Sequence, residues 1–242
     1  MAIHFVYDGL EDFLNVLRDQ KLCAEEAGFD LLVFSEVEHD FLRRHEAMIE
    51  REKLRIFKYA PDKQQLILKM PIRAVFVAQG RIFRYLTQQM TKVGMKDDDW
   101  MLLNGGDFEL ENGWTVEPDL ALYSMANNKR TSLFPRIVFE IGISQSVEEL
   151  RSRGDDYIRY SEGKINAVIY KAFRRPDQDQ AFESVIWGRG LITFDKDGHS
   201  ITTGPMIIPI GKVHPGTPDE LELSEENLVK ITEKFMLERW QE

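Results

Sequence analysis

Two acidic residues of this chain stand where carboxylates could share a metal ion. Asp119 follows Pro118 at the start of one apolar run, and Glu140 interrupts a second apolar run over 137–141. An ionised carboxylate within an apolar strand is costly unless a cation pairs with it. Two carboxylates on neighbouring strands commonly hold a hard divalent cation, which can lower the pKa of a bound water. The pattern therefore predicts a site for a hard divalent cation with Asp119 and Glu140 as ligands.

Structural roles for the same two acids remain open as alternatives. Asp119 could cap a turn after the proline, because Asp readily bonds its own backbone. Glu140 could instead form a buried salt bridge, with Arg136, Arg153 or Lys171 as its partner. Under that alternative, the chain is an unrelated α/β domain whose acids serve as structural ion pairs.

The hydrophobic pattern predicts the elements that must position these acids. Helices are expected over 9–27, 36–52, 72–93, 146–161 (capped by Ser144) and 224–240; strands over 29–35, 165–173 and parts of 183–210; and a hairpin over 54–71. Two further strands carry Asp119 and Glu140. The order predicts an α/β (α+β) protein with a mixed central sheet flanked by helices. We expect an N-terminal helical extension over 1–53 and a single globular unit over 54–242, which ends in a strand and helix extension.

Charge is distributed unevenly along the chain. The formal net charge is −10, so the long-range field repels nucleic acid and any DNA binding needs a local basic surface. The predicted helix over 72–93 contains arginines and a lysine but no acid. It is therefore the best candidate for a basic surface in an acidic protein.

The order hairpin, helix, Pro-Asp strand, Glu strand, helix, strand resembles the restriction-endonuclease-like superfamily, named for its PD-(D/E)XK signature. In that superfamily the Asp and the second acid bind divalent metal, usually Mg²⁺. A lysine two residues after the second acid helps to orient the attacking water. Here Pro118-Asp119 matches the first half of the signature, while Glu140 matches the second half with Gly142 in place of the lysine.

The run PRIVFEIGISQS also resembles a bacterial and fungal branch of such nucleases. In its bacterial members the lysine lies on the following helix, a few residues before a Tyr, about where Arg153 and Tyr157 stand. Arginine can supply charge and a bidentate phosphate contact but stays protonated, so it cannot act as a base. Arg153, or Lys171 in the next strand, is therefore expected to contact the scissile phosphate.

The resemblance covers residues 54–173 and implies a metal-dependent endonuclease that hydrolyses DNA phosphodiester bonds. It also implies a homodimer. The alternative is a catalytically inactive nuclease-fold protein that serves as a nucleic-acid-binding or protein-assembly module. The missing lysine and the acidic charge favour that alternative. The helix before the first motif also lacks its usual acid, and Gln79 is the nearest polar residue there.

The remaining sequence features suggest an intracellular location, in cytoplasm or nucleus. Cys23 is the only cysteine, which excludes a disulfide within the chain and suits a reducing compartment. No apolar run approaches the roughly 18 residues needed to span a membrane, so no membrane partner is expected. The acidic N-terminal region does not resemble a signal or transit peptide.

Overall fold

We describe the protein from a computed structural model, which defines most of the chain up to residue 172 and four short strands beyond it. The described ranges are 2–27, 31–52, 54–70, 73–127, 129–142, 145, 147–165, 167–172, 182–186, 191–194, 206–208 and 221–223. The predicted cap at Ser144 and the predicted helix over 224–240 lie outside these residues. The molecule combines helices with mixed sheets, which is the α+β class expected from the sequence.

The first sheet is built mostly from the N-terminal part of the chain. Its strand order is β1 (Ala2–Val6), β2 (Leu31–Ser35), β4 (Gln65–Lys69), β3 (Arg55–Ala60), β7 (Thr115–Val116) and β6 (Phe108–Glu109). Helices α1 (Leu10–Ala27) and α2 (Phe41–Arg51) contribute to a core packed on this sheet. The hairpin β3–β4 turns through the short 3₁₀ helix η1 (Pro61–Lys63).

The second sheet carries the two acids singled out from the sequence. Its strand order is β13 (Leu191–Phe194), β12 (Phe182–Ile186), β11 (Ala167–Ala172), β10 (Ile137–Gly142), β8 (Leu120–Ala126) and β5 (Trp100–Asn104), with β9 (Lys129–Arg130) paired to β8. Strands β5, β8 and β10 form an antiparallel meander, and β11 lies parallel to β10. Strands β14 (Met206–Ile208) and β15 (Leu221–Leu223) form a separate pair.

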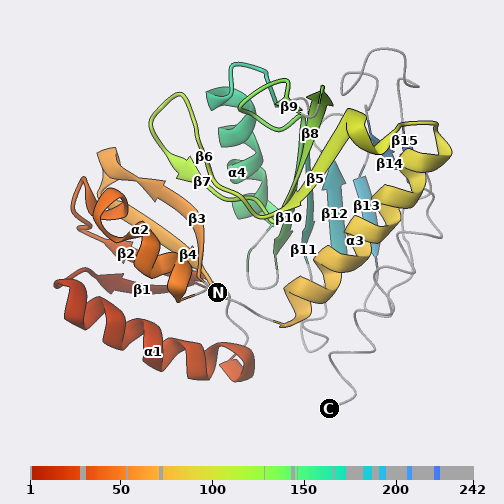
Figure 1. Ribbon diagram of the computed structural model, residues 1–242. Coiled ribbons are helices and arrows are strands. Elements are labelled where there is room, and N and C mark those ends of the chain that lie inside the picture. Colours follow the sequence, from red (N-terminus) through yellow and green to blue (C-terminus); the bar gives the residue numbers. More distant parts are fainter. Residues whose placement is uncertain are drawn as a thin grey trace.

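Two helices lie on opposite faces of the second sheet. The face that includes Ile137 and Phe139 packs against α3 (Arg73–Lys92), which is followed by the 3₁₀ helix η2 (Asp97–Asp99). The face that includes Val138 packs against α4 (Val147–Tyr160). Because successive strand residues point to opposite faces, this alternation directs Glu140 to the α4 side. Figure 1 shows the two sheets side by side, with α3 running along the second.

The observed elements match most of the predicted ones. Helices α1, α2, α3 and α4, the β3–β4 hairpin and the strands at Asp119, Glu140 and residues 165–173 all form where the sequence pattern indicated. Strand β1 was not predicted. The expected boundary between residues 53 and 54 falls within the first sheet, because β1 and β2 precede it and β3 and β4 follow it. Strands from both sides of that boundary share one core. Within the described part of the chain, no helix is both long and apolar enough to cross a membrane.

Two glycines should respond in opposite ways to an added methyl group. Gly80 lies exposed in α3, and no atom lies within 4 Å of the position that its Cβ would take. Gly→Ala in an exposed helix interior favours the helix, so Gly80→Ala should raise the free energy of unfolding by roughly 1 kcal/mol. A Cβ on buried Gly142 would lie 2.9 Å from both Gln145 Oε1 and Leu150 Cδ1. Overpacking of this kind should make Gly142→Ala less stable by about 1–3 kcal/mol. Urea unfolding of both variants measures the two changes. Equal changes in the free energy of unfolding would contradict the open space at Gly80 and the close packing at Gly142.

Candidate active site and its buried charge network

Asp119 is a fully buried carboxylate whose two oxygens accept four hydrogen bonds. Oδ2 accepts one from Lys69 Nζ and one from the backbone N–H of Ile141, each at 2.6 Å. Oδ1 accepts one from Arg55 Nη1 at 2.7 Å and one from Gln79 Nε2 at 3.0 Å. Its exposed fraction is 0 %. The lone pairs that a metal ion would use are therefore already engaged by protein donors.

The two cations that hold Asp119 come from the hairpin of the first sheet. Arg55 opens β3 and Lys69 closes β4, and they are directly opposite each other in the antiparallel register. Cross-strand partners point to the same face, where two like charges normally repel. Here the Asp119 carboxylate accepts a hydrogen bond from each of them, which offsets that repulsion.

Glu140 is the second buried acid, and it is paired through only one of its oxygens. Oε1 accepts hydrogen bonds from Arg153 Nε at 2.7 Å and from the Tyr157 hydroxyl at 2.6 Å. Arg153 and Tyr157 are four residues apart in α4, so they share the helix face that meets β10. Glu140 Oε2 is buried and has no hydrogen-bond partner.

Several contacts join these two centres into a single unit. Arg153 donates to the backbone carbonyls of Phe57 and Glu117, and its guanidinium lies 3.5 Å from the centre of the Phe57 ring. Arg55 Nε donates to Glu117 Oε1 at 2.9 Å. Lys69 Nζ also donates to the carbonyl of Ile141, the residue after Glu140, at 2.7 Å. We call this set the charge network; its charged members are Arg55, Lys69, Glu117, Asp119, Glu140 and Arg153.

The two acids respond in opposite ways to the same burial. Burial alone would raise the pKa of Asp119, but Lys69 and Arg55 outweigh it and lower that pKa to about 2. Burial raises the pKa of Glu140, and Arg153 only partly opposes it. Burial also raises the pKa of the Tyr157 hydroxyl well above its ordinary value, so this group stays protonated and donates to Glu140.

The structure unites three of the four residues predicted from the sequence. Asp119, Glu140 and Arg153 belong to the charge network, and of the three salt-bridge partners considered for Glu140 it is Arg153 that pairs with it. Lys171 lies in β11 opposite Ile141 in the parallel register, and its side chain lies outside the described residues.

Three donors to Asp119 differ in how visible they were in the sequence. Gln79 was identified as the polar residue on the preceding helix, and it does contact Asp119. Arg55 and Lys69 were missed, because the hairpin was treated only as part of the scaffold. Their ion pairs span 64 and 50 residues of sequence, so no local spacing indicated them. The hairpin pattern itself could have indicated these two residues, because it places Arg55 and Lys69 opposite each other.

The residues present do not fit a divalent metal as they stand. The charge network contains three acids and three bases, so its formal charge is zero, whereas Mg²⁺ sites rely on carboxylates that are free to bind the cation. Among the described residues, no group of three or more His, Cys, Asp or Glu side chains could hold a metal ion. Two oxygen atoms near Asp119 and Glu140 are not satisfied by protein donors, because Glu140 Oε2 and Gln79 Oε1 are buried without hydrogen-bond partners.

A cavity of about 290 Å³ lies between the first sheet and α4. Its walls include Arg153 and Tyr157 but neither Asp119 nor Glu140. A solute in the cavity would therefore meet the donors of the charge network rather than its carboxylates.

No protein-family model matches the chain, and a search of curated proteins found no match. The interpretation of the site consequently depends on its own geometry.

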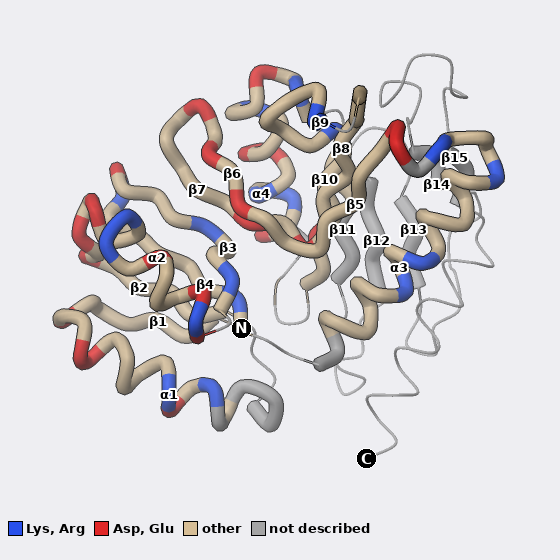
Figure 2. Tube along the Cα trace, in the orientation of Figure 1, with Lys and Arg blue, Asp and Glu red and all other residues tan. Residues whose placement is uncertain are grey.

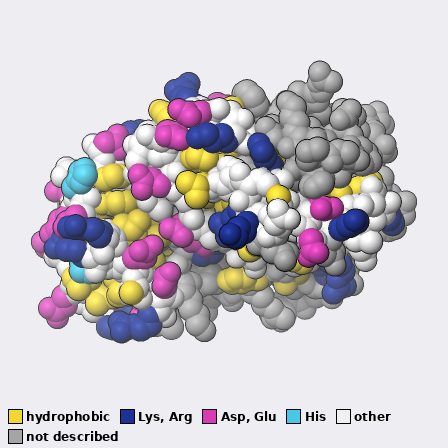
Figure 3. Space-filling model, turned by 45° about the horizontal axis from the view of Figure 1, so that its top comes forward, with side chains coloured by type: hydrophobic (Ala, Val, Ile, Leu, Met, Phe, Trp, Pro, Cys, Tyr) yellow, Lys and Arg dark blue, Asp and Glu magenta, His cyan; other side chains and the backbone are white. Residues whose placement is uncertain are grey.

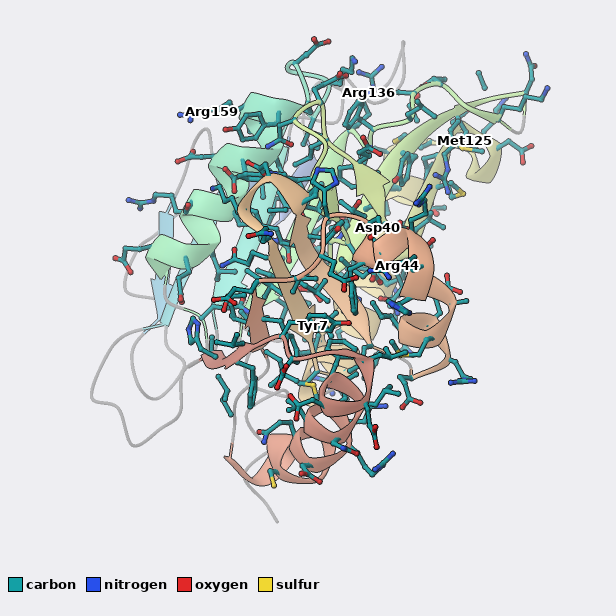
Figure 4. The ribbon with its side chains drawn as sticks, turned by 90° about the vertical axis from the view of Figure 1, so that its left-hand side faces the viewer. Tyr7, Asp40, Arg44, Met125, Arg136 and Arg159 are labelled. Atoms are coloured by element: carbon teal, nitrogen blue, oxygen red, sulfur yellow. The ribbon has the colours of Figure 1, made fainter. Side chains whose placement is uncertain are left out.

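Removing one cation from Asp119 should be far more damaging than breaking a surface pair. Lys69→Met leaves a buried carboxylate without one of its two charged partners, so we expect a loss of about 3–5 kcal/mol in the free energy of unfolding. Asp40 and Arg44, which lie together on the surface at α2 (Figure 4), form a pair at 3.1 Å and provide the matched control. Asp40→Asn should cost less than about 1 kcal/mol. Guanidinium chloride titrations measure both, and similar losses would contradict the central role of Asp119.

The lowered pKa of Asp119 also predicts how stability depends on pH. The pKa of Asp119 is 3.8 in the unfolded chain and about 2 in the folded protein, so the unfolded chain takes up the proton first as pH falls. This stabilisation is complete above about pH 4 and is lost as pH falls toward 2, with a magnitude on the order of 2 kcal/mol. Unfolding titrations between these pH values should give a steeper loss for the native protein than for Asp119→Asn. Parallel stability profiles for the two proteins would disprove the lowered pKa of Asp119. Glu140, whose raised pKa affects stability in the opposite sense, is present in both proteins and does not alter the comparison.

Proposed function

We propose that this chain is a restriction-endonuclease-like protein that binds nucleic acid without metal-dependent hydrolysis. The observation that carries the proposal is that all the lone pairs of Asp119 face protein donors while its side chain is fully buried. In this proposal the two acids of the signature hold the fold together, and the scaffold serves as a binding module.

The element order supports the superfamily assignment. The hairpin β3–β4, helix α3, the strand after Asp119, the strand with Glu140, helix α4 and strand β11 come in this order along the chain, with η2, β5, β6 and β7 between α3 and β8 and with β9 between β8 and β10. Strands β8, β10 and β11 share the second sheet, in which β8 and β10 are antiparallel and β11 is parallel to β10, whereas the hairpin β3–β4 belongs to the first sheet. The proposal assigns Asp119 and Glu140 to the two acidic positions of the signature.

Access and charge both argue against hydrolysis at this site. The exposed fractions of Asp119 and Glu140 are 0 % and 1 %, so neither a phosphodiester nor a hydrated cation reaches them in this conformation. Adding a divalent cation to a neutral buried set would introduce two uncompensated charges. Burying even one ion without a partner costs several kcal/mol. Hydrolysis would therefore require Lys69 or Arg55 to leave Asp119 first.

The second candidate function is the metal-dependent endonuclease itself, and one observation favours it. Glu140 Oε2 and Gln79 Oε1 are buried acceptors without donors, and oxygens of this kind suit a hard cation. In that case Asp119 and Glu140 would hold Mg²⁺ or Mn²⁺, which would supply an activated water and charge stabilisation. Lys69, already bonded to Asp119, would supply the cation that Gly142 lacks.

Calorimetry separates the two candidates. Titration of the native protein with Mg²⁺ or Mn²⁺ should give no site-specific heat, because no unengaged carboxylate pair is available. Glu140→Gln should give the same trace, and neither protein should cleave plasmid DNA in the presence of either metal. Stoichiometric binding by the native protein that disappears in Glu140→Gln would reject the non-catalytic proposal and favour the endonuclease.

The nucleic-acid part of the proposal depends on a local surface. Figure 3 shows acidic and basic side chains interspersed over the described part of the surface on this face, with no broad basic area. Helix α3 is different, because it carries basic residues and no acidic ones along its length (Figure 2). It is therefore the element through which a chain of net charge −10 can approach a phosphate backbone.

A further inference from the structure

The outward face of α3 combines aromatic and cationic side chains. Phe76 and Phe83 are exposed by 49 % and 38 %, although large apolar side chains usually turn inward. Arg84, Gln88 and Lys92 are exposed on the same helix. Next to Phe83 on the helix surface, Leu86 and Met90 turn into the core of the second sheet. Aromatic and cationic groups on one exposed face call for an explanation other than packing.

Helical geometry arranges these side chains in two lines. Phe76 and Phe83 are seven residues apart, which places them on nearly the same side of the helix and about 10 Å apart along its axis. Arg84, Gln88 and Lys92 follow each other at four-residue steps and form a second line, farther around the helix.

Small residues occupy the strip between the two lines. Gly80 has no side chain, and no atom lies within 4 Å of the place where its Cβ would be. The hydroxyls of Thr87 and Thr91 donate to the carbonyls of Phe83 and Thr87 within the helix, each at 2.9 Å. The strip is therefore low, with the two rings on one side and the two cations Arg84 and Lys92, separated by the neutral Gln88, on the other. We call the whole face, defined by Phe76, Gly80, Phe83, Arg84, Thr87, Gln88, Thr91 and Lys92, the α3 track.

We infer that the α3 track binds single-stranded nucleic acid, an inference that rests on the proposed function and specifies its ligand. Aromatic rings stack on any base, and a neighbouring line of cations follows the phosphates, which is the usual arrangement for binding single strands without sequence preference. Base faces are available for such stacking only where the strand is unpaired. The acids of η2, which begins five residues after Lys92, oppose phosphates beyond the C-terminal end of α3, so the strand should end its contact near Lys92.

Fluorescence anisotropy with labelled oligo-dT of about 20 nucleotides, and with a duplex of equal length, tests the inference. The native protein should bind the single strand more tightly than the duplex. Phe83→Ala should weaken binding of the single strand by roughly 5- to 150-fold, the range for loss of one stacked base. Leu133→Ala, which truncates an exposed side chain away from α3, should leave the affinity unchanged.

The charged line is tested through the salt dependence. Arg84→Gln should reduce the slope of log K against log salt by about 0.7, as expected for one lost contact to a single strand. Arg43→Gln, which removes an exposed arginine of α2, should keep the native slope. Gly80→Glu provides an independent variant, because it fills the strip with an acid at a position with open space and should abolish binding while the protein remains folded.

The outcomes distinguish the inference from the proposed function. Binding that persists unchanged in Phe83→Ala, Arg84→Gln and Gly80→Glu would refute the α3 track and leave nucleic-acid binding in place at another surface. Preference for the duplex would refute the single-strand assignment in the same way. Absence of binding to either oligonucleotide by the native protein would overturn the proposed function, and the inference would fall with it.

Discussion

The packing of the two sheets depends on the Asp119 carboxylate. The first sheet brings two cations to one position, and the second sheet brings one anion with its oxygens turned toward them. Each of these charges alone would cost several kcal/mol to bury, whereas together they neutralise and saturate one another. An additional backbone N–H from β10 fixes the carboxylate in the second sheet. The hairpin β3–β4 cannot shift along its register without separating Arg55 or Lys69 from this acid. The ion pairs therefore define how the sheets meet, in addition to any stability that they contribute.

Asp119 and Glu140 differ because of the number and charge of their donors. Asp119 has two full cations and two neutral donors, which together outweigh the effect of burial on its pKa. Glu140 has one cation and a hydroxyl on one oxygen, while the other oxygen has no partner. A buried oxygen without a donor lowers the free energy of unfolding, and it does so more when the carboxyl group is ionised. The weaker point of the charge network is consequently Glu140 and not Asp119. A metal signature would treat the two acids as equivalent, but in this network they are not.

Local patterns in the sequence predicted most of the elements but only part of the site. Local sequence signals located helices α1, α2, α3 and α4 and the strands that carry the acids, because these signals depend on residues a few positions apart. The pairing of Glu140 with Arg153 was also within reach, since one strand and the next helix bring them together. Arg55 and Lys69 were not, because their contact with Asp119 requires two sheets to meet across 50 or more residues. Strand β1 was missed for a related reason. It is a short edge strand that pairs in parallel with β2, on the other side of helix α1 in the sequence.

Helix α3 connects the closed site with the open surface. Through its inward side, Gln79 donates to Asp119, and through its outward side it presents exposed rings and cations. Gln79 lies three residues after Phe76 and four before Phe83, so it neighbours both rings on the helix surface, and the buried site adjoins the exposed face along α3. Exposed aromatic side chains such as Phe76 are an aggregation risk for a protein that does not use them. Under the proposed function this face of α3 holds a polyanion at the surface, while Asp119 and Glu140 stay buried in their ion pairs.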